Sequence, residues 1–120
     1  MDFDFYNKWE QIGTVKIGNP LIKKIVQLDS INKMNIIESI FPSGHPAEGE
    51  TLELYVLDEK KYQLAKDISE ILSDECQKAL IESQKNSIET KDSEEFNNPQ
   101  VLVKLLSLLL DPNTTHFALG

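Results

Sequence analysis

Residues 98–112 constrain the fold more than any other stretch, because they form an apolar run bounded by two prolines. Asn98 is a residue type that caps helices, and Pro99 suits a first helical turn, where its missing N–H needs no partner. Pro112 favours an end to the helix, since the residue before a proline is pushed away from the α region. Over 99–110 the only polar residues are Gln100, Lys104 and Ser107. The pattern predicts a helix that is apolar on every side.

A helix apolar on every side lies either at the centre of a core or in a membrane. About twelve residues at 1.5 Å each span ~18 Å, short of the ~30 Å hydrocarbon layer. We therefore expect residues 99–110 to be the central helix of one soluble domain that covers residues 1–120. The predicted fold class is mainly α, a compact domain of about five helices around this C-terminal helix. The composition, 40% apolar and 27% charged, is that of a folded domain.

Helical spacing of apolar residues predicts four further helical segments. Residues 2–11 are expected to form a short helix that carries Phe3, Phe5, Tyr6 and Trp9. A second helix begins at Asn19-Pro20, and a third segment covers 31–40 or continues the second. A long helix is predicted over 59–86, with a break at Ser73-Asp74 as an alternative. Cys76 falls on its apolar stripe and is expected to be buried.

Residues 51–57 alternate apolar and other side chains, which favours a strand over the alternative of a helical turn. The segments available to pair with it are 14–17 and 116–119. A small sheet around 51–57 is thus the α+β alternative to the mainly α fold. Prolines and glycines over 42–50 predict a loop, and the polar stretch 87–97 predicts an acidic connecting loop.

Charge is unevenly distributed along the chain. All twelve basic residues are lysines, against twenty acids. Residues 1–40 hold five of each, whereas residues 41–75 hold nine acids and three lysines. Nucleic-acid binding calls for a basic face, commonly with arginines, so direct binding of DNA or RNA is not expected. The acid-rich region instead favours a basic protein partner, because complementary charge steers association.

No catalytic or ligand motif is present in the sequence. It contains no phosphate-binding glycine loop, no Gly-x-Ser-x-Gly and no zinc or calcium spacing. His45 stands in the 42–50 loop without a Cys, His or Asp at metal-ligand spacing. We therefore expect no enzyme activity, metal or cofactor. One cysteine and the absence of an apolar leader or spanning segment favour a cytoplasmic protein without membrane contact.

These observations predict a non-catalytic acidic binding protein. Small acidic cytoplasmic immunity proteins, which neutralise bacterial toxins such as cationic nucleases, have this size, charge and lack of catalytic residues. The alternatives are a helical adaptor or assembly subunit with an apolar interface and, third, a small enzyme without a recognisable motif. The sequence leaves the oligomeric state open. The predicted partner-binding residues are Glu48, Glu50, Glu53, Asp58, Glu59, Tyr62, Asp67, Glu70, Asp74 and Glu75.

Overall fold

The computed structural model describes residues 1–8, 10–86 and 94–120 and shows an α+β fold. Its described elements are β1 (Asp2–Asn7), β2 (Glu10–Lys16), α1 (Asn19–Val26), α2 (Asp29–Asn32), β3 (Ile36–Ile40), β4 (Thr51–Val56), the 3-10 helix η1 (Asp58–Lys60), α3 (Lys61–Asn86), α4 (Glu94–Leu109) and β5 (His116–Leu119). The strands form one antiparallel sheet in the order β2-β1-β5-β4-β3. The mainly α prediction was therefore wrong.

The segment 2–11 forms strands β1 and β2 instead of the predicted helix. Phe3 and Phe5 alternate with Asp2 and Asp4, a period of two that places both rings on one face of the sheet. That face is the core, where the Phe3 and Phe117 ring centroids lie 5.0 Å apart. The clustering of aromatic side chains across strands outweighs local helix preference here. Trp9 lies outside the described residues.

The predicted helical segment 31–40 was also wrong beyond its first residues. Helix α2 ends at Asn32, and Ile36–Ile40 forms the edge strand β3. Three isoleucines within five residues favour an extended backbone, since β-branched side chains restrict rotamers in a helix. The helix beginning at Asn19-Pro20 was confirmed as α1, with a proline in its first turn.

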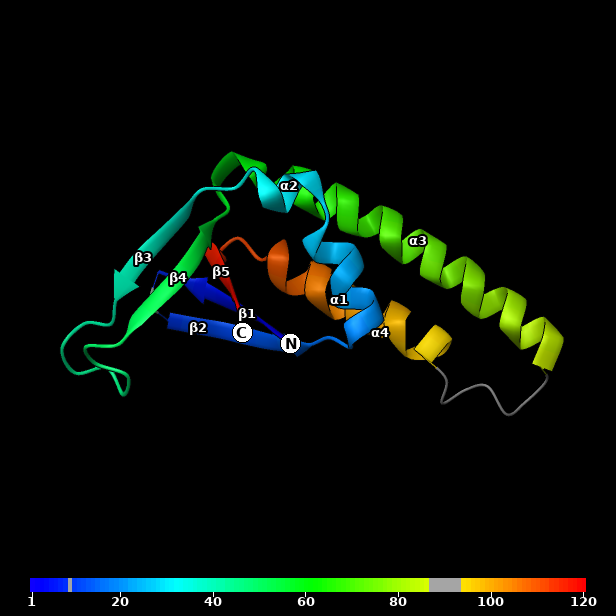
Figure 1. The fold of residues 1–120 in the computed structure, drawn as a ribbon, viewed down its shortest axis with the longest axis horizontal. Coiled ribbons are helices and arrows are strands. Elements are labelled where there is room, and N and C mark those ends of the chain that lie inside the picture. The colour runs from blue at the N-terminus through cyan, green and yellow to red at the C-terminus, as the bar shows by residue number, and fades with distance from the viewer. Residues whose placement is uncertain (9, 87–93) are drawn as a thin grey trace.

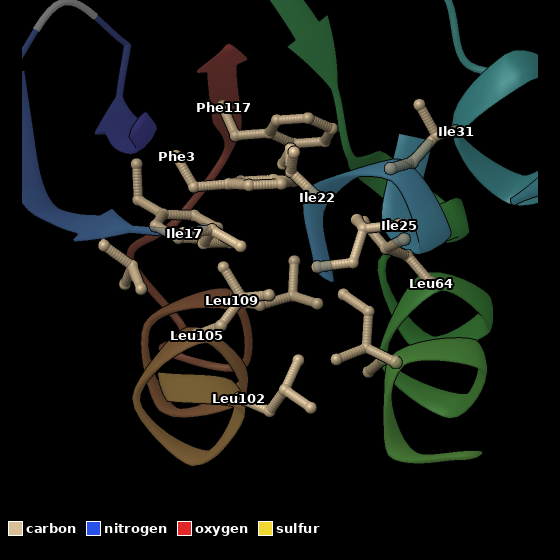
Figure 2. Packing of buried hydrophobic residues seen from close by; sticks show 14 of the residues in the cluster. Phe3, Ile17, Ile22, Ile25, Ile31, Leu64, Leu102, Leu105, Leu109 and Phe117 are labelled. Carbon is tan, nitrogen blue, oxygen red and sulfur yellow. The ribbon is translucent and has the colours of Figure 1, made fainter. Parts of the chain in front are cut away.

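Helix α4 begins at Glu94, before Pro99, so that proline lies inside the helix. Its burial is one-sided: Leu102, Leu105 and Leu109 are fully buried, whereas 55% of Val103 is exposed. Figure 2 shows the three leucines facing Phe3, Ile17 and the residues of α1 and α3. Helix α4 is thus one of the four α-helices described beside the sheet, and the prediction of a central helix was wrong.

The long helix was predicted well, as η1 followed by an unbroken α3. Its 26 residues span ~39 Å, within a molecule that measures 55 × 28 × 23 Å. Leu64 and Ile68 are fully buried on its inner side. Cys76 is exposed, which contradicts its predicted burial.

The small sheet of the alternative prediction exists, but it is larger than expected. Strand β4 (51–56) confirms the strand predicted over 51–57, and it pairs with the tail segment, which forms β5. Residues 14–16 of the other predicted partner, 14–17, lie in β2, but β2 pairs with β1 and not with β4. The 42–50 loop joins β3 to β4. Of the predicted loop 87–97, residues 87–93 lie outside the described residues, and 94–97 belong to α4. Within the described ranges, no helix is both long and apolar enough to cross a membrane.

Candidate binding surface

The β3–β4 hairpin extends beyond the rest of the sheet and away from the helices (Figure 1). Five residue pairs join β3 to β4, from Ile36 opposite Tyr55 to Ile40 opposite Thr51. By contrast, β4 pairs with β5 only at Tyr55 and Val56. Most of the hairpin is therefore held by its own ladder, and one side of β3 is a free sheet edge. We call residues 36–56 the arm.

The two faces of the arm have different surroundings. On one face, which we call the inner face, Leu54 is buried and packs with Tyr6 and Ala118, which anchors the arm to β1 and β5. The other face, which we call the outer face, continues the core side of the sheet: Tyr55 stacks on Phe117 at 4.7 Å and marks the end of the core. Beyond Tyr55 the outer face is open, and 52% of Ile36 and 64% of Ile40 are exposed. Exposed apolar area that is rimmed by polar residues is typical of a contact surface.

Two carboxylates face each other between these isoleucines. Glu38 on β3 lies directly opposite Glu53 on β4, and both side chains are exposed. The pair occupies a non-hydrogen-bonded position, where side chains come closest. Like charges directly opposite each other destabilise a sheet. No lysine of the described residues forms an ion pair with either carboxylate. The outer face of the arm is therefore apolar, acidic and unneutralised.

The arm's loop adds two further acids to this end of the molecule. Phe41 and His45 stack at 4.4 Å, and the Ala47 N–H donates to His45 Nδ1 at 3.0 Å. These contacts fold the loop on itself and leave Glu48 and Glu50 exposed. From Met34 to Glu59 the chain carries six acids and no lysine. These six acids lie on the arm or in η1 next to it, so negative charge is concentrated at this end of the molecule.

The predicted acids on α3 lie in a different setting. Over residues 61–86 five acids are offset by four lysines, so this helix is close to neutral. Asp67, Glu70 and Asp74 lie away from its buried side, and Tyr62 is 73% exposed. Figure 1 shows α3 running away from the arm. Asp58 and Glu59 in η1 connect the two regions. The predicted residues therefore divide into an arm group and a helix group.

Glu75 does not belong to either exposed group, because only 3% of it is accessible. Lys24 Nζ donates to its Oε1 at 2.8 Å, and Asn98 Nδ2 donates to its Oε2 at 3.2 Å. Burial alone raises the pKa of Glu75, but these hydrogen bonds and the charges of Lys24 and Lys78 outweigh it and hold the pKa below its usual value. Glu75 ties α1, α3 and α4 together, which is a structural role.

A second feature is a small pocket of about 180 Å³ on the inner side of the arm, lined by Lys8, Ile37, Ser39, Leu54 and His116. Burial lowers the pKa of His116 despite the opposing charge of Asp58, which favours a neutral ring. His116 Nδ1 lies 2.7 Å from the Thr115 hydroxyl, and no hydrogen bond joins it to Ser39. The ring nitrogen Nδ1 is therefore in contact with Thr115 and not with Ser39.

Metal-binding geometry is likewise missing in the described part of the chain, where no three His, Cys, Asp or Glu side chains cluster. A larger open groove of about 480 Å³ is lined by Asn7, Lys8, Glu10, Gln11 and His45. Its lining includes side chains of both charges and is about as apolar as it is polar, so no single kind of ligand group is favoured there. Of the surfaces described, the outer face of the arm has the most distinct chemistry.

Sequence reasoning placed Glu48, Glu50 and Glu53 near this surface but missed Glu38, Ile36 and Ile40. It assigned 31–40 to a helix and counted Glu38 within a neutral region. The available signal was the β-branched content of β3.

No family model matches the chain, and neither curated proteins nor solved structures gave a match.

Proposed function

We propose that this chain is a non-catalytic binding protein that recognises a basic protein through the outer face of the arm. The observation that carries the proposal is the Glu38–Glu53 pair, flanked by exposed Ile36 and Ile40 in a stretch without lysine. Two facing carboxylates reduce the stability of the hairpin, and a basic partner would convert this repulsion into attraction.

On such a surface the acidic and the apolar side chains contribute to binding in different ways. Exposed acids raise the rate of association with a basic partner, and this effect weakens as salt increases. The isoleucines supply apolar area that is removed from water in the complex. Tyr62 and the acids of α3 lie outside the arm. Among the predicted partner-binding residues they have less structural support than those on the arm.

The partner class that fits these properties is a bacterial toxin with a basic active domain, such as a cationic nuclease, which an immunity protein neutralises. An inhibitor of this kind needs a stable scaffold and an acidic surface but no catalytic groups. A cytoplasmic location suits it, since the exposed thiol of Cys76 stays reduced there. The adaptor with an apolar interface is the second candidate, and exposed Ile36 and Ile40 are the observation in its favour.

Affinity capture from a lysate of the source organism tests the proposal. Wild-type protein is compared with the double variant Glu38→Gln/Glu53→Gln and with the matched control Glu70→Gln/Asp74→Asn on α3. We expect a basic protein to be captured by the wild type and the control and lost with the arm variant. Capture by all three, combined with loss in Ile36→Ser/Ile40→Ser, would favour the adaptor instead.

A further inference from the structure

The free edge of β3 presents unpaired backbone groups beside the acidic pair. The Val56 N–H donates to the Asn35 carbonyl at 2.9 Å, and the Phe41 N–H donates to the Glu50 carbonyl at 3.1 Å. Bonded and non-bonded pairs alternate along an antiparallel ladder, so the odd-numbered residues of β3 bond to β4. The even-numbered residues, Ile36, Glu38 and Ile40, therefore direct their N–H and C=O groups outward. Because β3 is the last strand of the sheet, no strand among the described residues pairs with these groups.

Apart from Glu38, this edge lacks the features that normally prevent a further strand from pairing. Proteins protect sheet edges with charged side chains, most often lysines, and with prolines, bulges or covering elements. The other edge strand, β2, carries Lys16 and an irregularity opposite Phe5 and Tyr6, where Ile12 is the extra residue. Strand β3 has five regular pairs with β4 and contains neither lysine nor proline. Four of its five residues are exposed.

We propose that the basic partner adds an extended segment to β3 as a sixth strand. This inference rests on the proposed function and specifies how that partner binds. Backbone hydrogen bonds at Ile36, Glu38 and Ile40 hold the segment, and its side chains alternate between the two faces. On the outer face the matching pattern is apolar-x-basic-x-apolar. The basic side chain lies opposite Glu38, and Glu53 lies in the same row one strand further, on the other side of β3.

Charge argues for such a segment and against a second copy of this chain. Two β3 strands that pair antiparallel over all five residues place Glu38 of one copy directly opposite Glu38 of the other. Each Glu38 also lies beside the Glu53 of its own copy, so four like charges line up in a row across the sheet. A lysine or arginine in that position removes the repulsion that the arm already contains. The occupant that complements the edge is therefore a basic strand.

Amide hydrogen exchange by NMR tests the inference with a defined probe, the peptide acetyl-Ser-Val-Thr-Lys-Thr-Val-Ser-amide. At ~90 % saturation we expect exchange at Ile36, Glu38 and Ile40 to slow by about tenfold, because these amides become hydrogen-bonded. The amides of Ile37 and Ser39, which already bond to β4, should change little. The control peptide, with Glu in place of Lys, should bind more weakly.

A pair of variants separates backbone from side-chain contributions. Ile40→Pro removes one outward N–H, which an edge strand tolerates, whereas Ile40→Thr keeps it. We expect the proline variant to bind the Lys peptide roughly fivefold more weakly than the threonine variant. Unchanged amide dispersion for Leu54 and Phe117 in both variants confirms that the fold is intact.

Each contrary result has a distinct meaning. Peptide-induced shifts without slowed exchange at the three amides would overturn strand addition but leave charge recognition by the arm intact. Equal affinity for the Lys and Glu peptides would contradict charge recognition itself, and with it the proposed function. If exchange at these amides is already slow without peptide, and becomes slower as the protein concentration is raised, a second copy of the chain is the occupant. That result would overturn the inference. Absence of binding at the highest soluble peptide concentration would overturn it as well.

Discussion

At the scale of single residues, Glu75 is the one charged side chain that is buried among the described residues. Its carboxylate accepts hydrogen bonds from Lys24 and Asn98 across three helices. We expect Glu75→Gln to lower the free energy of unfolding by about 1–2 kcal/mol, because a charge-assisted hydrogen bond is replaced by a neutral one. Chemical denaturation at pH 7 measures this difference, and an unchanged midpoint would contradict the assigned role.

The pH dependence of that contribution follows from the lowered pKa of Glu75. A carboxylate whose pKa is lower in the folded state stabilises the protein above its unfolded pKa of ~4.3. The stabilisation is lost as the pH falls from there through the folded pKa. The difference in stability between wild type and Glu75→Gln should therefore shrink below pH ~4. A constant difference down to pH ~2 would mean that the carboxylate does not titrate with a lowered pKa.

Residues of α4 give a direct test of its one-sided burial. Leu105 is fully buried, whereas Val103 two positions earlier is exposed. Leu105→Ala should lower the free energy of unfolding by about 2–5 kcal/mol through loss of apolar contact and formation of a cavity. Val103→Ala should change it by less than about 0.5 kcal/mol. Similar losses for the two variants, measured by thermal unfolding, would argue that α4 is buried all round.

At the scale of elements, the arm carries a prediction in which stability and binding change in opposite directions. Glu53→Lys replaces a like-charge pair with an ion pair across β3 and β4. We expect the variant to be more stable by about 0.2–1 kcal/mol. The same change should weaken capture of the basic partner, because it puts a positive charge on the binding face. A variant that is both less stable and fully competent in binding would refute the assignment of this face.

Elements also show how far the sequence predicts the fold. The helix over 59–86 and the strand over 51–57 were predictable because each has a single, sustained period of apolar residues. The sequence of strand β1 also alternates with a period of two, in Asp2-Phe3-Asp4-Phe5. However, the spacing of four between Phe5 and Trp9 suits a helix as well. Strand β3 was ambiguous because Ile36, Ile37 and Ile40 fit both periods. The aromatic cluster of Phe3, Phe5 and Phe117 that decides the matter is non-local and cannot be read from either segment alone.

The helix at the C-terminal apolar run illustrates the opposite error. The long apolar run correctly indicates a helix. It does not show how much of the helix surface is covered by the rest of the protein. Val103 and Leu110 remain exposed because the sheet and α3 occupy only one side of it. Pro99 did not mark the start, because α4 begins five residues earlier, at Glu94, and continues through the proline although its missing N–H costs one helical hydrogen bond. Surface coverage is a property of the assembled fold.

At the scale of the whole molecule, the fold divides the acids that the sequence groups together. The candidates from Glu48 to Glu75 looked like one surface because they are close in the chain. The structure puts some on the arm and others along α3, and it buries Glu75. It also brings Glu38 beside Glu53 through strand pairing, a contact between residues fifteen positions apart. The candidate surface could therefore be located only in part from the sequence.

The central claim is that the arm's facing carboxylates recruit a basic partner, and association kinetics test it most directly. The association rate with the captured partner is measured for wild type and Glu38→Gln/Glu53→Gln as salt increases, which shortens screening from ~8 Å at physiological strength to ~3 Å at 1 M. We predict that the wild-type rate falls steeply with salt, and that the variant is slower at low salt and converges with the wild type at high salt. Equal rates and equal salt dependence for the two proteins would contradict the claim.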